Sequence, residues 1–86
     1  MSLDRVALLR AALEQALEPT ALEIRDDSAA HAGHAGAREG GHFFIRIASP
    51  RFQGLSTLAR HRLVYDAAGR LFGTHVHALS IDARLP

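Results

Sequence analysis

The fold is predicted from the stretch His42-Phe43-Phe44-Ile45-Arg46-Ile47-Ala48-Ser49, in which the side chains alternate with the period of a β-strand. One face of this strand carries Phe43, Ile45 and Ile47, and the other carries His42, Phe44 and Arg46. Aromatic and β-branched residues favour a half-buried strand, and Pro50 ends it because proline cannot donate a hydrogen bond to a sheet. The segment therefore predicts a strand with one face on the core.

An amphipathic helix is predicted upstream, from Ser2 to the residues before Pro19. Its apolar stripe recurs at steps of three and four residues and consists of Val6, Leu9, Leu13, Ala16 and Leu17. Ser2 is expected to cap this helix, and the carboxylate of Asp4 suits the positive end of the helix dipole.

A short strand and a long loop are expected between these two elements. Leu22 and Ile24 alternate with charged residues, which predicts a strand over residues 21–25. Residues 26–41 contain four glycines, five alanines and no large apolar side chain. Such a segment buries almost nothing and predicts an exposed loop.

A turn, a second helix and a third strand are predicted downstream of Pro50. The turn covers residues 51–54, and Ser56 or Thr57 caps a helix that runs to about Phe72, either unbroken or split. The inward positions of this helix are predicted to be Leu58, Leu63, Ala67 and Leu71. The strand covers residues 75–81, and one of its faces is predicted to carry His77, Leu79 and Ile81.

The resulting order is α-β-β-α-β, or α-β-β-α-α-β if the second helix is split. A strand, a helix and another strand in one sheet normally form a right-handed crossover, so the second and third strands are expected to be parallel neighbours. The first two strands are expected to be antiparallel. We therefore predict an α+β fold: a two-layer sandwich of helices on a three-stranded mixed sheet, with residues 1–86 forming a single domain.

Composition limits the function classes. A chain of 86 residues with 48% hydrophobic and 22% charged residues predicts one small folded core. The absence of cysteine excludes disulfides and thiolate ligands from this chain and leaves its six histidines as the obvious metal ligands. No apolar run is long enough to span a bilayer and no signal peptide is recognised, so we predict a cytoplasmic location without membrane association.

Three histidines are candidate metal ligands. His31 and His34 lie in the predicted loop, and His77 is expected at the rim of the core, facing the mouth of this loop. There are plainer alternatives. His31 and His34 could be three residues apart by chance, and His77 could be a core histidine whose ring nitrogens are hydrogen-bonded within the protein. Two imidazoles do not complete a structural zinc site, which usually has four protein ligands. They do suit half of a shared site, because imidazole can replace thiolate on one iron of an iron–sulfur cluster.

A basic cluster offers a different interpretation. Arg51, Arg60, His61 and Arg62 could contact the phosphates of a nucleic acid, or could form a solvated surface. The net charge of +1 gives no broad positive field, so nucleic-acid affinity would depend on this cluster alone. Phe44 is the aromatic residue near this cluster on which a base could stack.

No catalytic residues are predicted. Ser28, Ser49 and Ser56 lie outside any nucleophile motif, and no pair of carboxylates stands beside a histidine at an informative spacing. Asp26 and Asp27 suit a turn at the start of the loop. We therefore expect a protein that is not an enzyme.

Taken together, several segments resemble the BolA family. They are Leu22-Glu23-Ile24, Ser28-Ala29-Ala30-His31, Gly41-His42-Phe43, Ser49, Phe52-Gln53-Gly54, Arg60-His61-Arg62-Leu63-Val64-Tyr65 and Val76-His77-Ala78-Leu79. The resemblance implies an α-β-β-α-α-β fold similar to a class II KH domain. It also implies a monothiol glutaredoxin as partner, in a heterodimer that shares a [2Fe-2S] cluster, with a cysteine from the partner and a thiolate from glutathione.

The resemblance also implies the cluster ligands on this chain. His77 matches the family's histidine near the last strand, and His31, which follows Ser28, matches the ligand in the loop. His34 is the alternative loop ligand. No cofactor is expected in the isolated chain, which we expect to be a monomer or a weak homodimer.

An alternative function follows from the same resemblance. The family is linked to transcriptional regulation in stress response and cell morphology, which carries over to a DNA-binding role for Arg60, His61 and Arg62. RNA binding in the manner of KH domains is not expected, because that mode uses a Gly-x-x-Gly loop and residues 50–54 contain one glycine.

Overall fold

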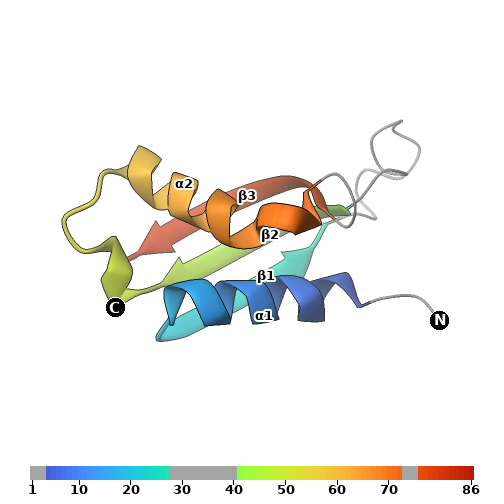
Figure 1. Cartoon of the computed structure of the whole chain (residues 1–86), viewed down its shortest axis with the longest axis horizontal. Coiled ribbons are helices and arrows are strands. Elements are labelled where there is room, and N and C mark those ends of the chain that lie inside the picture. The colour runs from blue at the N-terminus through green and yellow to red at the C-terminus, as the bar shows by residue number, and fades with distance from the viewer. Residues whose placement is uncertain (1–3, 28–40, 73–75) are drawn as a thin grey trace.

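The computed structural model describes residues 4–27, 41–72 and 76–86. The helices and strands are α1 (Arg5–Leu17), β1 (Ala21–Asp26), β2 (Gly41–Ala48), α2 (Thr57–Ala68) and β3 (Val76–Arg84), with short 3-10 turns η3 (Pro50–Phe52) and η4 (Gly69–Leu71). The strand order is β1-β2-β3; β1 is antiparallel and β3 parallel to β2. The predicted α+β fold with a three-stranded mixed sheet is therefore confirmed (Figure 1).

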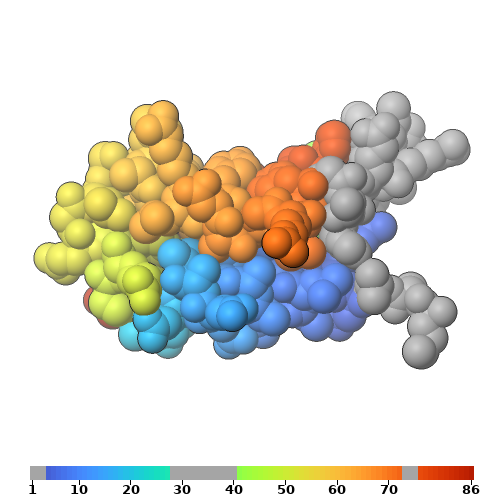
Figure 2. All heavy atoms as spheres, viewed as in Figure 1, coloured from blue at the N-terminus to red at the C-terminus, as the bar shows by residue number. Residues whose placement is uncertain are grey.

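The two helices form one layer and the sheet forms the other. Helix α1 contacts β1, helix α2 contacts β3, and the helices also contact each other. Figure 2 shows the two helices side by side across the viewed face of the molecule. The opposite face of the sheet carries no helix of the described residues.

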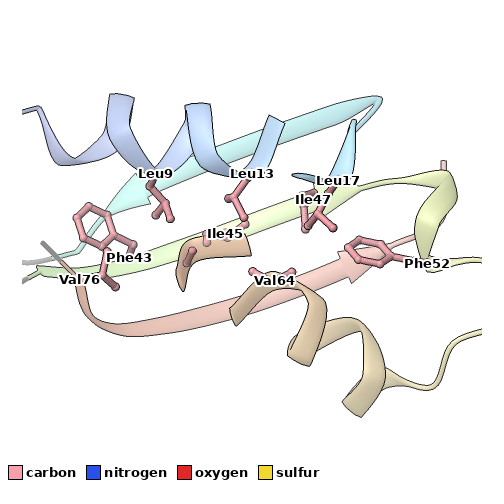
Figure 3. Close-up of a cluster of buried hydrophobic side chains, with 10 residues drawn as sticks. Leu9, Leu13, Leu17, Phe43, Ile45, Ile47, Phe52, Val64 and Val76 are labelled. Atoms are coloured by element: carbon pink, nitrogen blue, oxygen red, sulfur yellow. The ribbon is translucent and has the colours of Figure 1, made fainter. Parts of the chain in front are cut away.

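The hydrophobic core lies between these layers (Figure 3). Its fully buried side chains include Leu9 and Leu13 of α1, and the strand residues Phe43, Ile45 and Ile47. The alternation predicted for β2 is therefore confirmed, because these three residues face the helices. Phe52, Val64 and Val76 complete the core from η3, α2 and β3.

Ser49 connects the end of the sheet to the end of α1. Its hydroxyl is buried and donates a hydrogen bond of 2.6 Å to the backbone carbonyl of Leu17. The same oxygen accepts a bond of 3.1 Å from the backbone N–H of Arg51, at the start of η3. One side chain therefore satisfies the polar groups of two element ends that would otherwise lie beside the core.

The structure corrects two details of the first helix. Asp4, rather than Ser2, is the N-cap: its carboxylate accepts a hydrogen bond of 3.1 Å from the N–H of Ala7. Ser2 lies outside the described residues. Ala16 is exposed, because the buried stripe follows Leu9, Leu13 and Leu17 at a strict spacing of four residues. The helix ends before Pro19, as predicted.

The face predicted for the second helix was partly wrong. Leu58 is 60% exposed, whereas Val64 and Ala68 are buried. Leu63, Ala67 and Leu71 are half-buried and pack against the core as partly inward residues. Because six residues correspond to about one and two thirds turns of an α-helix, Leu58 points away from the side that Val64 occupies. Ser56 is the N-cap, as one of the two predicted alternatives.

Within residues 4–27, 41–72 and 76–86, no helix is long and apolar enough to cross a membrane.

Candidate metal centre

His77 owes its position to a β-bulge at the start of β3. In the parallel pairing, Gly41 lies opposite Val76 and His42 lies opposite Ala78, so His77 is an extra residue without a partner position on β2. Val76 is fully buried, while His77 is exposed. The prediction that His77 shares a face with Leu79 and Ile81 was therefore wrong, because the bulge reverses the alternation between Val76 and Ala78.

The exposed imidazole of His77 lies beside that of His42. The ring centroids are 5.3 Å apart, and the planes are inclined by 41°. His42 belongs to the outward face of β2 and is half-buried. No role was predicted for His42 from the sequence. Its proximity to His77 could have been predicted from its place at the start of β2, because parallel pairing brings the starts of β2 and β3 together.

The histidine pair lies at the end of the sheet from which the predicted loop departs. The N–H of Asp27 donates a hydrogen bond of 2.7 Å to the carbonyl of His42, and Gly41 pairs with Val76. Both residues that flank segment 28–40 are thus anchored beside His42 and His77. His31 and His34 lie outside the described residues, so their predicted role stays a prediction.

Ion pairs cross the helix-free face of the sheet. Arg46 of β2 lies 3.8 Å from Glu23 of β1 and 3.4 Å from Asp82 of β3, and Asp82 also pairs with Arg84 at 2.8 Å. The hydrogen bond from Arg84 and the charges of Arg84 and Arg46 hold the pKa of Asp82 below its usual range. The stabilisation that Asp82 contributes is therefore present at neutral pH and is lost as the pH falls through this lowered pKa.

Phe44 lies on the same face and is covered by cations. The guanidinium groups of Arg25 and Arg46 lie 4.8 and 5.7 Å from its ring centroid. Arg25 also pairs with Asp27 at 2.8 Å, and this hydrogen bond raises the pKa of Arg25. A base that stacked on Phe44 would have to displace these arginine side chains.

Two of the four residues predicted to bind nucleic acid, Arg60 and Arg51, have partners within the protein. Arg60 is half-buried; its Nε donates a hydrogen bond of 3.0 Å to the carbonyl of Leu55, and its Nη1 one of 3.2 Å to that of Ala83. Arg51 forms an ion pair with Glu18, and His61 is half-buried. Within the described ranges, Arg62 alone of the four is an exposed cation without an ion pair. The arrangement leaves few groups for phosphate.

We expect Arg60→Ala to lower the free energy of unfolding by about 1 to 3 kcal/mol, because two backbone carbonyls lose a charged donor. Arg62→Ala should change it by less than about 0.5 kcal/mol, as is usual for an exposed side chain. Urea denaturation of both variants measures the difference. Equal stability of the two variants would refute the structural role of Arg60.

The imidazole of His77, the more exposed of the pair, suits a borderline metal and an incomplete site. The described residues contain no cluster of three or more His, Cys, Asp or Glu side chains that could hold a metal ion. Imidazole binds zinc, copper, nickel and iron, whereas hard cations prefer oxygen ligands. His77 is exposed and lies between Val76 and Ala78, which both pair with β2, so its imidazole can serve as one ligand of a site that other groups complete.

Comparison with known proteins agrees with this fold. The family model of BolA-like protein matches residues 13–86. BolA-like protein 1 of Mus musculus is 48% identical over 80 residues, which cover 93% of this chain and 57% of that protein. Protein BOLA1, chloroplastic, of Arabidopsis thaliana is 40% identical over 87 residues, or 96% of this chain and 54% of that protein. The chain thus spans a little over half the length of these curated relatives.

Solved structures give the same result. The BolA domain of SufE1 from Arabidopsis thaliana matches with a TM-score of 0.86 and 44% sequence identity, over 100% of this chain and 96% of that one. One relative's name places it in the chloroplast, so the cytoplasmic location predicted here stays a prediction. Both the sequence match, which includes the His77 strand, and the architecture show that the chain belongs to the family of BolA-like proteins.

Proposed function

We propose that this chain is a non-enzymatic adaptor that binds a monothiol glutaredoxin and shares a [2Fe-2S] cluster with it, for iron–sulfur trafficking or for regulation by iron or redox state. The observation that carries the proposal is the bulge that turns His77 out of the core. A side chain needed for packing would lie inward, as Val76 does. An exposed imidazole on a hydrogen-bonded strand is instead available to a partner.

The chain supplies only part of a ligand set. It has no cysteine, so any thiolate must come from elsewhere, and the proposal assigns this role to a partner cysteine and to glutathione. Imidazole ligands on one iron raise the reduction potential of a [2Fe-2S] centre relative to an all-thiolate one. When bound, the cluster would supply one-electron redox chemistry or serve as cargo, and this chain would hold one of its iron atoms.

The second ligand is assigned to the loop. His31 follows Asp27, whose backbone is anchored to His42, by only four residues of sequence. His34 is further along and loses more conformational freedom when it binds. We therefore assign His31 as the principal loop ligand and His34 as its substitute.

Loop variants test this assignment. His31→Ala should give a weaker or spectrally shifted cluster, because His34 substitutes for the lost ligand. The double variant His31→Ala with His34→Ala should retain little cluster. Visible absorption and circular dichroism are measured on complexes prepared with excess glutaredoxin and glutathione at one pH. An unchanged cluster in the double variant would exclude the loop as a source of ligands.

The DNA-binding alternative has less support. Its predicted contacts include Arg60 and Arg51, whose guanidinium groups already bind Leu55, Ala83 and Glu18. A phosphate contact by Arg60 would require the loss of two hydrogen bonds within the protein.

A further inference from the structure

The two imidazoles of His42 and His77 form a pair on adjacent, hydrogen-bonded strands. His77 is exposed and His42 is half-buried, so solvent reaches the pair. Their backbones are held by the parallel pairing of β2 with β3, which continues to Ala48 and Arg84. Little backbone entropy would therefore be lost when a ligand joins the two side chains.

The separation of the rings fits one shared ion. Two imidazoles that bind a tetrahedral metal through nitrogens at about 2.0–2.1 Å have ring centres roughly 5 Å apart. The observed distance between the centroids is 5.3 Å, and the rings are tilted rather than stacked. Each ring has two nitrogens, and its terminal torsion has a broad range, so one nitrogen of each ring can turn toward a common point without movement of the strands.

We infer that His42 and His77 form a binding site for a single divalent transition-metal ion, such as Ni²⁺ or Zn²⁺, with water in the remaining positions. The ligand chemistry excludes Mg²⁺ and Ca²⁺, which require oxygen donors. Since the site has two imidazoles, its affinities should follow the general order for nitrogen ligands, with Ni²⁺ bound more tightly than Co²⁺.

The site has a regulatory consequence that rests on the proposed function. His77 cannot bind this ion and an iron of the shared cluster at the same time. A divalent ion on the pair therefore competes with cluster assembly, and His42 confers this sensitivity without being a cluster ligand. The adaptor would share a cluster only where such ions are scarce.

The binding test uses the isolated chain, titrated calorimetrically with NiCl₂, ZnCl₂, CoCl₂ and MgCl₂. His42→Asn and His77→Asn should each weaken Ni²⁺ binding by at least about tenfold, because each removes one of two ligands. His61→Asn, on α2, is the matched control, and the loop variant His31→Asn with His34→Asn tests the other histidines. Both should bind Ni²⁺ within about threefold of the wild type. Tight binding that survives in His42→Asn, or that is lost in the loop variant, would overturn the inference.

A second measurement separates this inference from the proposed function. With glutaredoxin and glutathione, His42→Asn should assemble as much cluster as the wild type but should no longer be inhibited by added Zn²⁺. Equal Zn²⁺ inhibition of both proteins would refute the metal-binding role of His42. If neither protein assembles a cluster, the competition is refuted together with the proposed function, whereas the Ni²⁺ titration still decides the site.

Discussion

His77→Ala should abolish or greatly weaken the cluster in the complex with a monothiol glutaredoxin, while the melting temperature of the isolated chain changes little. The side chain is exposed at a bulge and contributes little apolar burial, so its removal leaves the core intact. The removed imidazole is the one proposed cluster ligand that lies within the described residues. Absorption spectra of the complex and thermal melts of the isolated variant give the two readouts.

His61→Ala is the control for this variant, since it removes an imidazole from α2 rather than from the end of the sheet. Its complex should have the wild-type spectrum. Two outcomes would contradict the account of His77: a full cluster in His77→Ala, or loss of the fold in that variant. The second outcome would show that His77 stabilises the bulge itself.

Phe52→Ala should lower the free energy of unfolding by about 3 to 5 kcal/mol, the usual cost of truncating a fully buried phenylalanine. Phe52 projects from η3 into the core beside residues of both layers (Figure 3). Small domains are stable by only about 5 to 15 kcal/mol, so this variant should be close to unfolding at 37 °C. Urea denaturation monitored by circular dichroism measures the change.

Leu58→Ala is the matched control, because it truncates a large apolar residue that is 60% exposed. Its cost should be below about 0.5 kcal/mol. If Leu58→Ala were as destabilising as Phe52→Ala, the orientation of α2 described here would be wrong.

The elements with a strong period could be predicted from the sequence. The alternation of Phe43, Ile45 and Ile47 determines which face of β2 is buried, and the connection through a helix determines that β3 is parallel to β2. Pro19 and Pro50 place the ends of α1 and β2 because proline removes a backbone donor.

The bulge at His77 could not be predicted, because a period-two pattern assumes that every residue has a partner. Val76 and Leu79 are both apolar, and either could begin the inward series in an unbroken strand. Because Val76 pairs with Gly41, Val76 faces the core and His77 faces outward, beside His42. The histidine pair is thus a consequence of register, which the sequence of one strand does not contain.

The structural role of Arg60 could not be predicted either, because its hydrogen-bond partners are backbone carbonyls that lie near it only in the folded chain. Leu55 precedes α2, and Ala83 lies near the end of β3. A basic residue on a helix is equally consistent with solvent, phosphate or such a contact. Leu58 was misplaced for a related reason: α2 carries apolar residues on more than one side, so its period alone does not identify the buried face.

The visible absorption spectrum of this chain purified together with a monothiol glutaredoxin and glutathione decides whether His77 contributes a ligand to a shared cluster. We expect a coloured 1:1 heterodimer whose spectrum differs from that of the glutaredoxin alone and reverts to it in His77→Ala. A colourless complex, or a spectrum identical to that of the glutaredoxin without this chain, would contradict the proposal that His77 contributes a ligand to a shared cluster.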